Sequence, residues 1–117
     1  MSNQEKAQKL IYATISKTLN AYYGKAPDNI KNPCIVYNNV VNSIYMGMTG
    51  NTDMQSASNR FTYQVDIYAD KASELLTYKE QVMSDIHLLN GNMLITGTED
   101  TKDEGFRARI NVSVFIN

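Results

Sequence analysis

The sequence of 117 residues has one cysteine, one histidine and no tryptophan. A single cysteine, Cys34, excludes an internal disulfide and a metal site made of several thiolates within one chain. We expect Cys34 to be a buried core residue rather than a reactive thiol. The histidine, His87, has no carboxylate, imidazole or thiolate one turn away on its predicted helix. A structural or solvent-exposed role is therefore expected for it, and no cofactor.

An excess of charge and a long apolar run are both absent. Eleven Lys and Arg residues against twelve Asp and Glu residues give a formal net charge of −1, and no basic run occurs. This balance argues against a protein built mainly to bind phosphate backbones. No segment approaches the roughly 18 apolar residues of a membrane span, and the first residues lack the apolar stretch of a signal peptide. We expect a protein of cytoplasmic origin, without membrane or sequence-specific nucleic-acid partners.

The composition is that of a folded domain. Hydrophobic residues make up 43% of the chain and charged residues 20%, which is too apolar for general disorder. The length fits one domain, so we expect a single unit over residues 1–117.

The first predicted element is a helix that begins at Ser2. Glu5 follows Ser2 at the spacing of a capping box, and Gly24 and Pro27 are typical of a helix end. Residues at spacings of three or four form one apolar stripe: Ala7, Ile11, Ile15, Thr18 and Tyr22.

Short strands are predicted next. Residues 34–37 form a β-type run, Asn38-Asn39 marks either a turn or a bulge, and residues 40–48 resume the strand pattern. Residues 47–59 are rich in Gly, Ser, Thr, Asn and Asp, which predicts a loop or hairpin tip.

The second half carries the clearest patterns. Residues 61–68 alternate apolar and polar, as in a strand with one buried face. Asp70 stands at the expected N-cap of a helix over residues 71–89, and Asn90-Gly91 marks its end. A strand at 93–95, an acidic connection at 97–105 and an alternating strand at 106–116 follow.

These elements predict an α+β fold in the order α-β-β-β-α-β-β. Strands close in sequence tend to pair as hairpins, so we expect a mostly antiparallel sheet with two helices packed on one face.

Two groups of acidic residues are candidates for a catalytic or cation-binding site. Asp66 and Asp70 could together serve an acid–base reaction or hold a cation, but solvation of Asp66 and capping by Asp70 explain both more simply. A second group lies in the acidic connection and lacks the spacing of a calcium loop: Glu99, Asp100, Asp103 and Glu104. We therefore expect no enzyme, and no metal or catalytic site.

The last strand carries the residues most open to interpretation. Arg107, Arg109 and Phe115 share its outward face, which is either solvated or in contact with a neighbouring subunit or a lumen. On the second interpretation, reversing either arginine's charge should leave folding intact and disturb assembly. Met48 and Met54, in the polar loop, are further candidates for an interface.

The order of elements, and above all RFTYQVDIYADKASELLTYKEQVMSDIHLL at residues 60–89, resembles the tail terminator and tail-completion proteins of long-tailed bacteriophages. The resemblance covers most of the chain and is one of shape, without a catalytic signature. It implies a homo-oligomeric ring, expected to be a hexamer, that caps the tail tube protein and meets the head connector or stopper. It also implies a place in the virion at the head–tail junction, after assembly in the host cytoplasm. Another neck or head-completion protein of the virion, and a non-viral ligand-binding domain or enzyme, are the alternatives.

Overall fold

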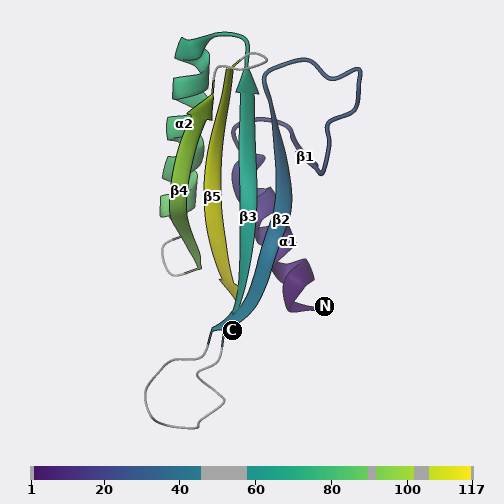
Figure 1. Cartoon of the computed structure of the whole chain (residues 1–117), viewed down its shortest axis with the longest axis vertical. Helices are drawn as coiled ribbons and strands as arrows, with labels where there is room; N and C mark the ends of the chain where they lie inside the picture. Colours follow the sequence, from purple (N-terminus) through teal and green to yellow (C-terminus); the bar gives the residue numbers. More distant parts are fainter. Residues whose placement is uncertain (1, 46–57, 90–91, 102–105, 117) are drawn as a thin grey trace, which may run out of the picture.

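A computed structural model describes residues 2–45, 58–89, 92–101 and 106–116 of the chain (Figure 1). The elements are α1 (Asn3–Ile15), β1 (Ala21–Tyr23), β2 (Cys34–Tyr45), β3 (Ser58–Ala69), α2 (Ala72–His87), β4 (Met93–Thr101) and β5 (Phe106–Ile116). The α+β class and the order α-β-β-β-α-β-β are confirmed.

The strands form one five-stranded sheet in the order β1-β2-β3-β5-β4. All neighbours pair antiparallel except β1 and β2, which are parallel. Both helices lie against the same face of the sheet (Figure 1), as the sequence predicts. The opposite face, which we call the open face, has no helix over it in the described part of the chain.

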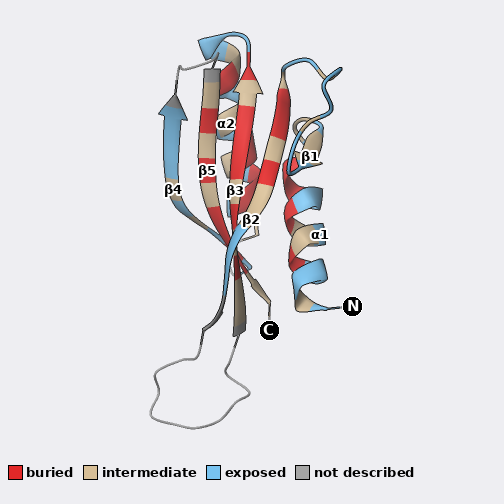
Figure 2. Cartoon of the chain, turned by 45° about the vertical axis from the view of Figure 1, so that its right-hand side comes forward, coloured by how far each residue is buried: buried red, intermediate tan, exposed pale blue. Residues whose placement is uncertain are grey.

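The core lies between the helices and the sheet, where the alternation of β3 and β5 puts every second side chain (Figure 2). On α1 and α2 the buried residues recur at helical spacing and face these strands. The largest fully buried apolar side chains are Tyr63, Ile11, Ile15, Ile35, Ile67, Ile86 and Ile110.

The first helix is shorter than predicted. It ends at Ile15, and residues 21–23, predicted to be helical, instead form β1 alongside β2. The backbone of this segment gains partners there, since Gly24 N donates to Tyr37 O at 3.0 Å and the Tyr23 and Tyr37 rings meet edge to face at 5.2 Å. Gly24 does have the left-handed backbone expected of it, with φ of 82°, but it ends β1 rather than α1.

A bulge within one strand follows the Asn38-Asn39 pair: both asparagines pair with β3, and Val40 is the extra residue. The predicted strands at 34–37 and 40–48 are joined in β2, and the register to β3 shifts between Asn39 and Val41. The Asn39 side-chain amide donates to Asn42 Oδ1 at 2.8 Å and to the Thr62 carbonyl at 3.1 Å. These bonds satisfy polar groups that the extra residue would leave unpaired.

The prediction that Asp70 caps α2 is wrong. The N-cap is Lys71, which has extended backbone and makes no side-chain capping bond. Asp70 instead accepts a hydrogen bond from the Asn32 side chain at 3.2 Å. The carboxylate therefore joins the start of the helix to the loop before β2.

The acidic connection begins later than predicted. β4 continues from Met93 through a register shift between Ile95 and Gly97 to Thr101, because its backbone pairs with β5 along this length. Glu99 is thus a strand residue, and Asp100 pairs with Lys79 of α2 at 3.0 Å. The other members of the acidic group, Asp103 and Glu104, lie outside the described residues.

Candidate interaction surface on the open face of the sheet

Arg107, Arg109 and Phe115 all lie on the open face, because Ala108 and Ile110 between them in β5 are buried under the helices. The register places four further side chains of β3 on this face that belong to no predicted site: Arg60, Thr62, Gln64 and Tyr68. Met48 and Met54 lie outside the described residues.

Arg109 is held by Asp66 across the strand pair. Its Nε donates to Asp66 Oδ1 at 2.8 Å and its Nη2 to Oδ2 at 3.3 Å. The Asp66 side chain is only 8% exposed and that of Arg109 only 23%. The prediction that Asp66 is solvated is therefore wrong. Asp66 does lie on the outward face of the strand, as predicted, but neighbouring side chains and the guanidinium cover it.

This contact changes the expected role of Arg109. The hydrogen bond to Asp66 raises the pKa of the guanidinium above its ordinary value, with a smaller opposing effect from burial. The Gln64 amide lies beside the same group, and in the orientation that satisfies both, its oxygen accepts from Arg109 Nε at 3.3 Å and Nη1 at 3.2 Å. Arg109 is thus tied into the sheet, and its charge is largely neutralised.

Arg60 belongs to a second polar contact, nearer the end of the sheet. Its Nε donates to Ser113 Oγ at 2.9 Å, and Thr62 Oγ1 lies 3.5 Å from the same oxygen. Ser113 is fully buried although it faces the open side. The alternation of β3 could have predicted this position, since Arg60 points to the same face as Thr62 and Asp66.

Arg107 and Phe115 remain the candidates that the sequence identified for contact with a partner. No carboxylate of the described residues lies within ion-pair distance of Arg107 or Arg60. The Arg107 Nε is buried without a hydrogen-bond partner in the described part of the chain. Phe115 is half-buried beside Arg60, its cross-strand neighbour.

Cys34 is buried, as predicted, but not under the helices. It lies on the open-face side of β2, where a hollow of about 400 Å³ around it is lined by residues 24–28, Ile30, Asn32, Val36 and Tyr68. Burial raises the pKa of the thiol, which disfavours the reactive thiolate. The loop before β2 thus covers one end of the open face.

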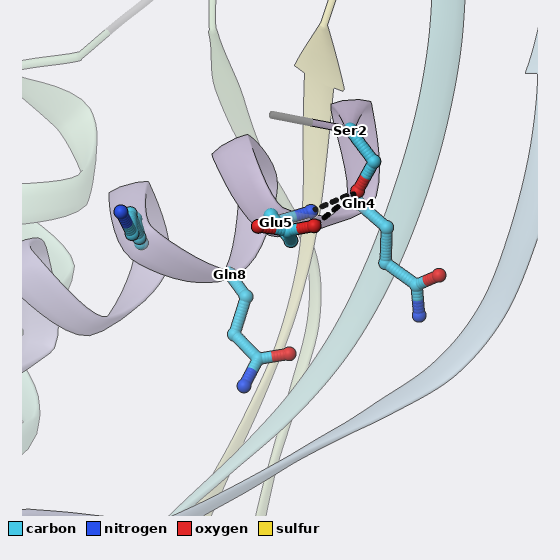
Figure 3. Close-up of a pocket in the computed structure, with 5 residues that line it drawn as sticks. Ser2, Gln4, Glu5 and Gln8 are labelled. Carbon is cyan, nitrogen blue, oxygen red and sulfur yellow. Dashed lines mark hydrogen bonds between the residues drawn. The ribbon is translucent and has the colours of Figure 1, made fainter.

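A hollow of about 390 Å³ lies at the start of α1, among polar side chains (Figure 3). Half of the predicted capping box is present there. Ser2 Oγ accepts from Glu5 N at 3.1 Å, but Glu5 Oε1 accepts from the Ser2 hydroxyl at 3.3 Å rather than from the Ser2 backbone N–H. The Ser2 side chain therefore caps one backbone N–H of the first turn.

His87, Asp66 and Asp70, the described residues considered for catalysis or metal binding, do not form one site. His87 is exposed in the last turn of α2, and Asp66 and Asp70 are bound to Arg109 and Asn32 respectively. In the described ranges, no three His, Cys, Asp or Glu side chains are grouped to hold a metal ion. Neither α1 nor α2 is long and apolar enough to span a bilayer.

Comparison with known proteins adds no relative. No family model matches the chain, and no curated protein matches it.

Proposed function

We propose that the chain is a structural virion assembly protein that caps a phage tail tube as a ring, stops tube growth and joins the tail to the head connector. The proposal rests on the likeness of residues 60–89 to tail terminator and tail-completion proteins and on one structural observation. That observation is a sheet that, in the described part of the chain, has helices on one face only, with Arg60, Arg107 and Phe115 on the other.

The open face suits a protein partner better than a small substrate. Its central charge, Arg109, is neutralised by Asp66, while Arg60 and Arg107 have no acidic partner in the described ranges. Cationic guanidinium groups beside an aromatic ring are common in protein interfaces, where arginine and aromatic residues are enriched. We assign this face to the contact with the tube or the connector.

Tube assembly in the presence of the chain tests the proposal. We expect rings by native mass spectrometry, and tubes that carry a ring at one end and stop growing, by negative-stain microscopy. Arg107→Glu and Arg60→Glu should keep the fold and weaken capping, because both reverse charges on the open face. Lys71→Glu, an exposed charge reversal at the start of α2, is the matched control and should cap normally. Tubes of unchanged length, or monomers alone at high concentration with and without tube protein, would contradict the proposal.

The two alternatives give different outcomes in the same preparation. A neck or head-completion protein of the virion would bind the connector and leave tube growth unaffected. A ligand-binding domain would stay monomeric and gain thermal stability from a metabolite, since a ligand stabilises the folded state that binds it.

A further inference from the structure

Besides the outer edge of the short strand β1, two strand edges of the sheet are without a neighbouring strand in the described part of the chain. One is the outer edge of β4, Met93–Thr101. The other is the part of β2 beyond β1, which pairs only with residues 35–37, so that residues 38–45 have β3 on one side alone. Unpaired strand edges are templates for pairing with another chain unless charge or cover protects them.

An exposed apolar side chain stands at each edge, and the charged residues of β4, Glu99 and Asp100, lie farther along the strand. Leu94 of β4 is 56% exposed, and Val41 of β2 is 55% exposed. The register connects them, since Leu94 pairs with Ser113, Ser113 with Thr62, and Thr62 with Val41. Leu94 and Val41 therefore lie at the same position along the strand direction, which we call height. Both are on the open face, at opposite edges of the sheet.

The two flanks of the sheet also carry opposite charge. Residues 2–25, which include α1 and β1, contain four lysines and one glutamate, a formal charge of +3. Residues 72–101, which include α2 and β4, contain five carboxylates and one lysine, a formal charge of −4 with His87 neutral. Such asymmetry favours contact between unlike flanks of two copies and disfavours contact between like flanks.

We propose that the first part of β4, residues 93–97, pairs in the next copy with residues 38–42 of β2, which β1 leaves free, so that the sheet continues from subunit to subunit around the ring. This inference rests on the proposed function and names the interface within it. Leu94 then packs beside Val41 of the neighbouring copy, and the acidic α2–β4 flank lies against the basic α1–β1 flank.

The strand directions agree with this arrangement. β2 is antiparallel to β3, β3 to β5 and β5 to β4, so β4 runs opposite to β2. If neighbouring copies are related by rotation about an axis parallel to the strands, the strand directions are the same in both copies. The β4–β2 pair between copies is therefore antiparallel, like most pairs within the sheet. The contact joins two different surfaces, which is the type that closes into rings. Each strand also has a register shift near this height, at Asn39/Val41 and Ile95/Gly97, so both edges bend at similar levels.

Complementary charges at the two edges test the pairing. Leu94→Asp and Val41→Lys should each reduce the mass of the assembly, measured by light scattering after size-exclusion chromatography, to that of the monomer. The double variant should restore the ring, because every interface then joins one aspartate to one lysine. Lys71→Asp, at an exposed residue that belongs to neither charged flank, is the matched control and should leave the mass unchanged.

A cysteine pair gives a second measurement if a charged variant folds poorly. With Leu94→Cys and Val41→Cys in one chain, oxidation should yield a ladder of disulfide-linked oligomers up to the ring, while either cysteine alone should not. Dimers from Leu94→Cys alone would show a β4–β4 contact and overturn the inference. A wild-type ring that none of these variants affects would overturn the edge pairing but not the ring. A wild-type chain that stays monomeric with tube protein present would overturn both.

Discussion

Among single residues, the three arginines of the open face are of two kinds. Arg109 is bound twice to a nearly buried carboxylate, whereas Arg60 and Arg107 have no acidic partner among the described residues. Charge reversal at Arg109 would place a second carboxylate against Asp66. The sequence-based expectation that Arg109→Glu leaves folding intact is therefore replaced by one of destabilisation, while Arg107→Glu remains a test of assembly.

Removal of the Arg109 guanidinium should lower stability because it leaves Asp66 covered and unpaired. For Arg109→Ala we expect a loss of about 1–3 kcal/mol in the free energy of unfolding, measured by urea denaturation. Arg107→Ala is the control and should lose less than about 1 kcal/mol. Equal losses in the two variants would show that the Asp66 contact does not stabilise the fold.

Tyr63 provides a prediction for alkaline pH. The side chain is fully buried, its hydroxyl has no hydrogen-bond partner among the described residues, and burial raises the pKa of Tyr63 to about 12. The unfolded chain ionises near pH 10, so the neutral phenol contributes stability that is fully present below pH 10 and lost as pH rises toward 12. Stability should fall by about 1 kcal/mol from this group by pH 11.

Urea denaturation of wild type and Tyr63→Phe at pH 8 and pH 11 measures this effect. The variant removes an unpaired hydroxyl, so at pH 8 it should be as stable as wild type or more so. Its stability should also fall less than that of wild type between the two pH values. The same fall in both proteins would assign the alkaline loss to other groups.

At the level of elements, α2 is held by its buried stripe rather than by a capped start. α2 begins at Lys71 without a side-chain cap, yet Val82 and Ile86 are fully buried against the sheet. Packing of an apolar face supplies most helix stability in proteins, which explains why α2 tolerates an uncapped start.

A charge in this stripe should unfold the domain. For Val82→Asp we expect loss of the native far-ultraviolet circular dichroism at neutral pH, because an unpaired buried carboxylate costs several kcal/mol against a margin of about 5–15 kcal/mol. Ile110→Asp should act in the same way from β5, where Ile110 is also fully buried. Leu76→Asp, on the exposed side of α2, should retain the native spectrum. A folded Val82→Asp protein would mean that the site admits water.

At the scale of the whole molecule, charge and sheet topology point in the same direction. The basic α1–β1 flank and the acidic α2–β4 flank lie at opposite ends of one continuous sheet. A molecule that is almost neutral in total is thereby polarised across its width, which suits head-to-tail contact between copies.

This charge polarity predicts that ring formation depends on the salt concentration. Screening shortens the range of charge interactions from about 10 Å at 0.1 M salt to about 3 Å at 1 M. We expect sedimentation velocity to show smaller species at high salt, at a protein concentration that gives rings at low salt. Glu99→Lys, which lessens the charge of the acidic flank, should form fewer rings at low salt and respond less to added salt. Ring formation that is independent of salt would leave the apolar and backbone contacts as its source.

Elements with a long and regular periodicity can be predicted from the sequence alone. The alternation along β3 and β5 and the helical spacing in α2 each identify an element and its buried face, because side-chain direction follows directly from backbone period. The same alternation put Arg107, Arg109 and Phe115 on the open face.

Features that depend on a partner distant in sequence could be found only in the folded chain. Residues 21–23 leave the helical pattern because the edge of β2 pairs with them, and the bulge at Val40 lies where the Asn39 side chain bonds to Thr62 across the sheet. Asp66 looked solvated because a two-residue period tells which face a side chain takes and not what lies beside it. Its neighbour Arg109 comes from a strand 43 residues away, and the register that joins them is set by the whole sheet.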